Sequence, residues 1–231
     1  WITLMLGHDL ASDDGGAYNA TSIRESAVVW SGGANVAGLP KVLLVGDSIS
    51  IGYLPFVTAA LEGRCIVAHH EGNSGDSRNV LDHLDAWLAA DADAAILHFN
   101  VGLHDLRRWH DGRGYQVPLA AYRENLGRIV ARLKATGKPL IWATITPVVD
   151  ERIAATVPDF VRHDADVRAY NAAARTIMDA HNIPVNDLYA VVAAAGIDET
   201  LCPDGTHMTE AGYRLLGQAV ARAVRQELDS R

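Results

Sequence analysis

The chain has 231 residues, of which 49% are hydrophobic and 21% are charged, and this composition is ordinary for a folded protein with one large domain. The net charge of −8 argues against nucleic acid or an anionic membrane surface as its main partner. No stretch approaches the roughly 18 consecutive apolar residues of a membrane-spanning helix, so we expect no membrane span.

The first 38 residues differ from the rest because they are rich in Gly, Ser, Asp and Asn and show no clear periodicity. We expect residues 1–38 to form an N-terminal arm, with a short strand at 28–30. This arm packs on a main domain spanning 39–231 or joins copies of the chain in a homo-oligomer. Residues 1–6 lack the length and the basic flank of a signal peptide, so the sequence leaves the compartment open.

Short apolar runs alternate with helical patterns from Lys41 onward. The first run, 42–45, is wholly apolar and ends at Gly46, which is typical of a strand buried on both faces. Further strands are predicted near residues 65–68, 94–97, 140–143 and 183–185. Helices with one apolar face are predicted near residues 56–61, 80–88, 122–133 and 167–178, and a last helix follows Thr209. Long loops are expected at about 100–117 and from the fourth strand to about residue 164.

Strands that alternate with helices indicate an α/β domain with a parallel sheet, and right-handed crossovers place helices on both of its faces. Ligands bind such sheets beyond the carboxyl ends of the strands, so the residues just after each strand are the candidates for function. Cys65, at the entry of the second strand, and Cys202, in a loop at the opposite sheet edge, are expected to lie too far apart for a disulfide.

A serine, a histidine and an aspartate stand at such positions. Ser48 follows the first strand, whereas Asp204 and His207 precede the last helix. A serine hydroxyl needs an adjacent base, and histidine suits this task because its unperturbed pKa of about 6.5 lies near working pH. Asp204 can orient that histidine from the same loop. The backbone N–H groups of Ser48 and Gly75 are suitable donors to the oxyanion that forms in acyl transfer.

Four sequence blocks, in the right order, resemble those of the SGNH (GDSL) hydrolase family. Residues 46–50, Gly-Asp-Ser-Ile-Ser, are similar to its Gly-Asp-Ser-Leu block, and residues 73–76, Asn-Ser-Gly-Asp, are similar to its second block. Residues 102–105, Gly-Leu-His-Asp, are similar to the Gly-x-Asn-Asp third block, and 204–207, Asp-Gly-Thr-His, are similar to the fifth. The resemblance spans about residue 40 to the end of the last helix.

This resemblance implies a three-layer α/β/α flavodoxin-like domain with a five-stranded parallel sheet in the order 2-1-3-4-5. It also implies a hydrolase without metal or cofactor that cleaves carboxylic acyl esters through an acyl-enzyme. The resemblance also implies that Ser48 is the nucleophile, His207 the base, Asp204 the partner of this base and Gly75 an oxyanion donor. The expected partner is a small-molecule ester; a small acyl group such as acetyl, carried on a carbohydrate, is favoured, while lipid esters and thioesters remain alternatives.

One position departs from the family pattern, because His104 stands where the third block has asparagine. We expect His104 to replace that asparagine as the third oxyanion donor, since a neutral imidazole can donate one N–H. Asn100 is the fallback donor, or else it ties down the loop. Asp47 and Asp105 are expected to support the loops around the site rather than to act chemically.

Other interpretations of these residues and of the function remain open. His69, His70, His98 and His110 could suggest a metal site together with His104, but the chain has no H-E-x-x-H pattern, and histidines satisfied within the core or rim are the simpler interpretation. Residues 107–109, Arg-Arg-Trp, fit either a substrate contact or a solvated surface. A non-catalytic flavodoxin-like module that binds a ligand or a glycan is the alternative to an enzyme; the first strand–helix turn has no phosphate-binding G-x-G-x-x-G pattern.

Overall fold

The computed structural model describes residues 38–230, so the predicted arm lies outside the described residues apart from Gly38. Its main sheet is parallel and has the order β2-β1-β3-β6-β8. The strands are β1 (Lys41–Val45), β2 (Ile66–His69), β3 (Ala94–Phe99), β6 (Leu140–Ala143) and β8 (Val185–Asn186). Numbered among themselves, these strands follow the predicted order 2-1-3-4-5, which confirms the fold.

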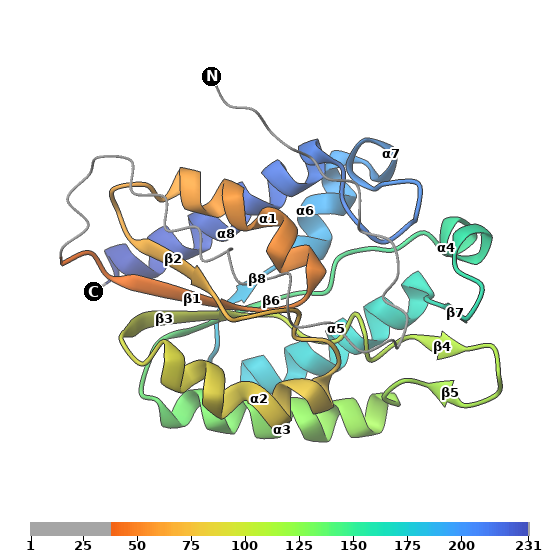
Figure 1. Cartoon of the computed structure of the whole chain (residues 1–231), viewed down its shortest axis with the longest axis horizontal. Coiled ribbons are helices and arrows are strands. Elements are labelled where there is room, and N and C mark those ends of the chain that lie inside the picture. Colours follow the sequence, from red (N-terminus) through yellow and green to blue (C-terminus); the bar gives the residue numbers. More distant parts are fainter. Residues whose placement is uncertain (1–37, 231) are drawn as a thin grey trace, which may run out of the picture. The chain divides into compact units, whose positions relative to one another are not determined.

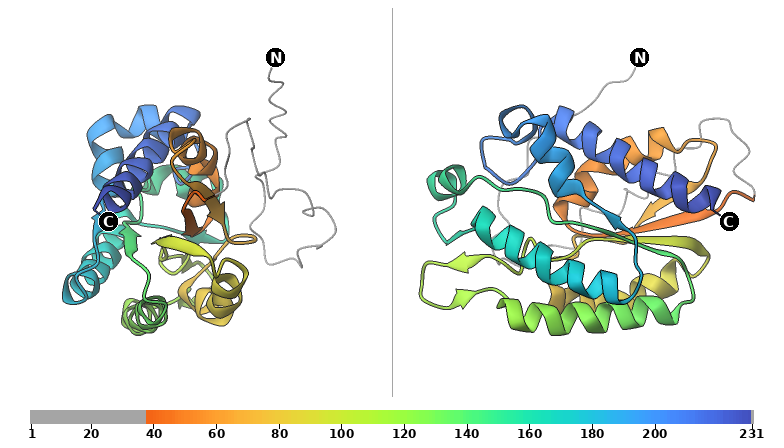
Figure 2. Two further views of the ribbon diagram at one scale, coloured as in Figure 1. Left: turned by 90° about the vertical axis from the view of Figure 1, so that its left-hand side faces the viewer. Right: turned by 180° about the vertical axis from the view of Figure 1, so that it is seen from behind.

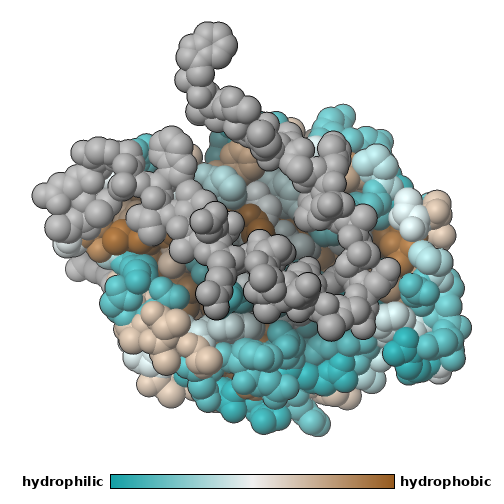
Figure 3. Space-filling view, in the orientation of Figure 1, coloured by the Kyte–Doolittle hydropathy of each residue, from teal (hydrophilic) through white to brown (hydrophobic). Residues whose placement is uncertain are grey.

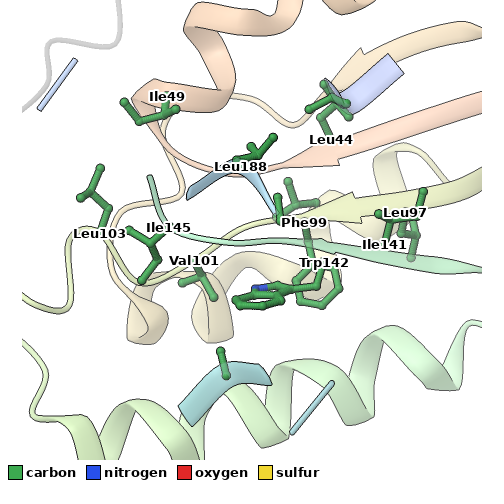
Figure 4. Packing of buried hydrophobic residues seen from close by; sticks show 14 of the residues in the cluster. Leu44, Ile49, Leu97, Phe99, Val101, Leu103, Ile141, Trp142, Ile145 and Leu188 are labelled. Carbon is green, nitrogen blue, oxygen red and sulfur yellow. The ribbon is translucent and has the colours of Figure 1, made fainter. Parts of the chain in front are cut away.

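Helices cover both faces of this sheet (Figures 1 and 2). One layer contains α1 (Ser48–Ala60), α6 (Leu188–Ala195) and α8 (Glu210–Asp229), and the other contains α2 (Ser77–Ala90), α3 (Leu119–Ala135) and α5 (Asp164–Ala180). Burial on both faces explains why the strands are continuously apolar: Val42, Leu43 and Leu44 are all fully buried. Figure 4 shows Phe99 and Trp142, from the ends of β3 and β6, packed within the same core.

A second, small sheet occupies the segments where the sequence predicted only loops. Its strands β4 (Arg108–Trp109), β5 (Gly114–Tyr115) and β7 (Phe160–Val161) are antiparallel and run in the order β5-β4-β7. Three helices, α4 (Asp150–Thr156), α6 and α7 (Ile197–Thr200), were also not predicted. Elements this short carry no readable periodicity, which is why the loop prediction was wrong there. The small sheet lies beyond the carboxyl ends of the main strands (Figure 1).

The surface in view over α2 and α3 is mostly hydrophilic (Figure 3). Among the described residues, Ile51 is the one large hydrophobic side chain that is exposed. None of the helices within residues 38–230 combines the length and the apolar character needed to cross a membrane. Cys65 and Cys202 are both free thiols, as expected from their places in the sheet order.

Asp105 ties the loop after β3 to the start of α2. Its fully buried carboxylate accepts hydrogen bonds from the Ser77 backbone N–H, at 3.0 Å to Oδ2 and 3.2 Å to Oδ1, and from the Ser77 hydroxyl. Burial raises the pKa of Asp105 to about 7; the Ser77 hydrogen bonds oppose this shift, and the negative charge of Asp76 adds to it. The side chain therefore ties the loop of the third block to the start of α2, next to the second block.

Gly217 allows α8 to pack against α1. A Cβ atom built on Gly217 would lie 2.5 Å from the Cβ of Phe56 and 3.2 Å from the backbone N of Val57. Real Cβ atoms do not approach other atoms so closely, so a side chain at this position must push the two helices apart.

We therefore expect Gly217→Ala to lower the free energy of unfolding by about 1–3 kcal/mol, because it overpacks a close helix contact. Gly127 in α3 is the matched control, since its Cβ would meet no atom within 4 Å. There the same substitution should raise the free energy of unfolding by about 0.5–1 kcal/mol through helix propensity alone. Urea unfolding of both variants measures the contrast, and equal shifts would contradict the packing argument.

The raised pKa of Asp105 predicts how stability depends on pH. Above pH 4 an unfolded aspartate is ionised, whereas the native Asp105 keeps its proton until its pKa of about 7. The stability from this group is therefore present in acid and is lost as the pH rises through about 7. The variant Asp105→Asn does not titrate at this position. Relative to it, the wild type should lose about 4 kcal/mol of unfolding free energy between pH 4 and 8. Urea unfolding at both pH values measures it, and parallel profiles would refute the buried, protonated carboxyl.

Candidate active site

Ser48 is the first residue of α1 and directly follows the turn after β1. Asp47 caps this helix, because its Oδ1 accepts a hydrogen bond of 3.0 Å from the backbone N–H of Ile49. Burial raises the pKa of Asp47, although the Ile49 hydrogen bond and the positive charge of Arg162 favour its ionised form. Asp47 thus caps the helix that begins at Ser48.

Ser48, His207 and Asp204 form one hydrogen-bonded chain. The Ser48 Oγ lies 3.0 Å from His207 Nε2, and His207 Nδ1 lies 2.6 Å from Asp204 Oδ2. The other carboxylate oxygen of Asp204 accepts the backbone N–H groups of Thr206 and His207, each at 2.9 Å. With its Nδ1 proton directed to Asp204, the imidazole offers Nε2 as an acceptor for the serine proton.

Asp204 is held in its ionised form. Burial alone would raise its pKa, but the hydrogen bond with the His207 ring and the two backbone N–H groups outweigh burial and lower it to about 2. A permanent negative charge therefore faces Nδ1 of His207 throughout the neutral range. Such a charge fixes the imidazole tautomer and stabilises the imidazolium that forms when the ring takes a proton.

Gly75 has the backbone conformation of a turn, with a φ of 61°, which an L side chain rarely adopts. Its N–H group donates a 2.9 Å hydrogen bond to Oδ1 of Asn73, two residues earlier. The expected oxyanion donor is thus engaged in a local turn in this structure. The Asn73 side chain has to rotate away before this N–H can meet a ligand.

His104 is only 6% exposed, in the loop that follows β3. Burial lowers its pKa well below the usual value, and the positive charges of Arg107 and Arg162 act in the same direction. The imidazole is therefore neutral at neutral pH and has one N–H to donate. The fallback donor Asn100 is already engaged, because its amide donates a 2.8 Å hydrogen bond to the carbonyl of Ala143 and so ties β3 to β6.

The two arginines that act on the charge of His104 are themselves buried. Arg107 and Arg162 are 8% and 6% exposed, and their guanidinium carbons lie 4.8 and 4.9 Å from the centroid of the Phe160 ring. The sequence left Arg107 open between a substrate contact and a solvated surface, and the second option is wrong for this residue. Sequence reasoning missed Arg162 altogether, since an arginine in an expected loop looks the same whether it is exposed or buried.

Three further histidines, His69, His70 and His98, make contacts with neighbouring side chains. His98 is fully buried in β3, where its Nε2 lies 3.3 Å from the Asn186 amide nitrogen, and His70 stacks on Trp87 with ring centroids 3.9 Å apart. His69 Nε2 lies 2.6 Å from the hydroxyl of Ser50, two residues beyond Ser48. Within residues 38–230, no three His, Cys, Asp or Glu side chains come together in a way that could hold a metal ion.

Comparisons with known proteins identify the family of this chain. The model of the GDSL-like lipase/acylhydrolase family matches residues 44–215, a span that includes Ser48, Asp204 and His207. The chain is 22% identical over 203 residues to the GDSL esterase/lipase CPRD49 of Arabidopsis thaliana, an alignment that covers 81% of this chain and 79% of that protein.

Solved structures of similar proteins share the fold. A lipase/acylhydrolase from Enterococcus faecalis is 24% identical, has a TM-score of 0.69 and aligns over 82% of this chain and 97% of its own. A catalytic mutant of an acetylxylan esterase from Geobacillus stearothermophilus is 19% identical, has a TM-score of 0.62 and aligns over 80% of this chain and 94% of its own. Because the family model matches well over half of the sequence, the chain belongs to the GDSL-like lipase/acylhydrolase family and is a carboxylic ester hydrolase.

Proposed function

We propose that Ser48, His207 and Asp204 are the catalytic triad of this hydrolase and that the reaction proceeds through an acyl-enzyme on Ser48. The observation that carries the proposal is a chain of two hydrogen bonds. Ser48 Oγ lies 3.0 Å from His207 Nε2, and His207 Nδ1 lies 2.6 Å from Asp204 Oδ2. Nucleophile, base and orienting acid within hydrogen-bond reach of one another are what acyl transfer by serine requires.

In the proposed mechanism, Ser48 Oγ attacks the ester carbonyl while its proton passes to His207 Nε2. The carbonyl oxygen becomes an oxyanion that accepts hydrogen bonds from the backbone N–H groups of Ser48 and Gly75 and from the neutral His104 ring. His207 then returns the proton to the leaving alcohol. Water then attacks the carbonyl of the acyl-enzyme while His207 takes its proton. His207 returns that proton to Ser48 as the acid is released.

A short acyl group, such as acetyl on a carbohydrate, is the proposed substrate class. Similarity to acetylxylan esterases supports an acetylated carbohydrate as the alcohol part.

Ser48→Ala tests the triad. Without its nucleophile, the enzyme should lose about four to six orders of magnitude in kcat on a chromogenic acetate ester, and a serine-directed phosphonate should no longer label it. Ser50→Ala is the matched control, because Ser50 lies on the same helix and also meets a histidine, His69, at 2.6 Å. That variant should retain most of the activity and of the labelling. An active Ser48→Ala variant, or loss of activity in Ser50→Ala alone, would place the nucleophile elsewhere.

A pair of substitutions at position 104 tests the third oxyanion donor. His104→Ala removes the N–H and should lower kcat by about 10²–10³-fold with little change in KM, since the oxyanion exists only after attack. His104→Asn restores the donor that the family has at this position and should retain kcat within about tenfold of the wild type. Steady-state kinetics of the two purified variants measure this. Equal kcat values in the alanine and asparagine variants would show that the position donates nothing.

A further inference from the structure

Arg162 joins the two loops that hold the proposed oxyanion donor and the proposed base. Its Nε donates a 3.0 Å hydrogen bond to the carbonyl of Leu103, the residue before His104. Its Nη1 donates a 3.3 Å hydrogen bond to Oγ1 of Thr206, the residue before His207. Both contacts are buried, so water does not compete for them.

The small sheet places this side chain. Arg162 directly follows β7, and β7 pairs with β4, where Phe160 lies opposite Trp109. The guanidinium also lies over the Phe160 ring, so the contacts with ring and loops define its plane. The end of β7 therefore positions the side chain, and its N–H groups donate hydrogen bonds to two loops that are about a hundred residues apart in the chain.

An arginine suits this task better than any other cation. The guanidinium is planar and rigid, so donors on Nε and Nη1 point in fixed directions and fix two acceptors relative to each other. A lysine ammonium is a point charge on a flexible stem and sets no such geometry. The positive charge also acts on its surroundings, since it disfavours protonation of His104 and favours the ionised form of Asp47.

We propose that Arg162 is a positioning residue of the hydrolase, which fixes the His104 loop relative to the His207 loop through Leu103 and Thr206. This inference rests on the roles given to His104 and His207 under the proposed function. Misplacement of a catalytic group by about 1 Å can cost about 100-fold in rate, so a bridge between these loops has a catalytic effect without touching the substrate.

Arg162→Met, Arg162→Lys and the wild type are compared on a chromogenic acetate ester, with kcat calculated per active site titrated by a serine-directed phosphonate. Arg162→Met should lower kcat about 100-fold and leave KM nearly unchanged. Arg162→Lys keeps the positive charge but loses the two donors of fixed direction, so its kcat should stay at least about tenfold below that of the wild type. Arg225→Met is the matched control: its Nη1 donates to the carbonyl of Ala60, a helix-to-helix contact, and its kcat should be unchanged.

Thr206→Val removes one of the two acceptors with little change in volume, so it tests the bridge even if the Arg162 variants fold poorly. It should lower kcat by about tenfold, and in the Arg162→Met background it should have almost no further effect, because the two residues act through one contact. Independent, additive effects on kcat would overturn the proposal. So would a kcat per titrated site that is normal in Arg162→Met with only the melting temperature lowered, or full recovery of kcat in Arg162→Lys.

Ser48→Ala in the same assay separates the two ideas. If that variant stays active, the proposed triad fails. If activity depends on Ser48 while the Arg162 and Thr206 variants turn over normally, the triad stands and only the positioning role is refuted.

Discussion

The contact between Ser48 and His207 joins residues 159 positions apart, and much of the structure is arranged around it. Ser48 begins α1 and His207 lies three residues before the start of α8, so the distance between them depends on how closely these helices pack. Glycine makes the close approach possible: a Cβ on Gly52 would lie 2.2 Å from the ring of Tyr213. The packing of two helices on one face of the sheet therefore determines whether a serine and a histidine from opposite ends of the domain can share a proton.

The sheet fixes the other half of the geometry. Parallel strands buried on both faces end at a common rim, and the loops after β1, β2 and β3 leave that rim together. The apolar runs in the sequence predicted these strands, and therefore the positions of Ser48, Gly75 and His104 after successive strands. The order of the strands was implied by the family resemblance. The local Asp204–His207 pair was also predictable, because His207 stands three positions after Asp204 within one loop.

What the sequence did not reveal depends on contacts between distant segments. The small sheet β5-β4-β7 pairs two-residue strands from two separate loops, and neither piece has enough residues to show an alternating pattern. Burial of Arg107 and Arg162 follows from that pairing and from the shared Phe160 ring, so no local signal marks either residue. One unpredicted contact is local: the N–H of Gly75 is engaged by the Asn73 side chain, in a turn that composition alone does not predict.

A histidine in place of the family's asparagine changes what the surroundings must do. An asparagine amide donates its N–H at any pH, whereas an imidazole donates in a defined way only if its charge and tautomer are settled. Burial and the charges of two arginines keep His104 neutral, which leaves one proton on the ring. One proton on a rigid ring is a directional donor, so the backbone that carries it has to be held in place. The Arg162 hydrogen bond to the carbonyl just before His104 meets that need, and the same guanidinium supplies part of the charge that keeps the ring neutral. Under the proposed function the histidine and the buried arginine therefore act as one unit, in which the proposed donor His104 depends on the small sheet that delivers Arg162.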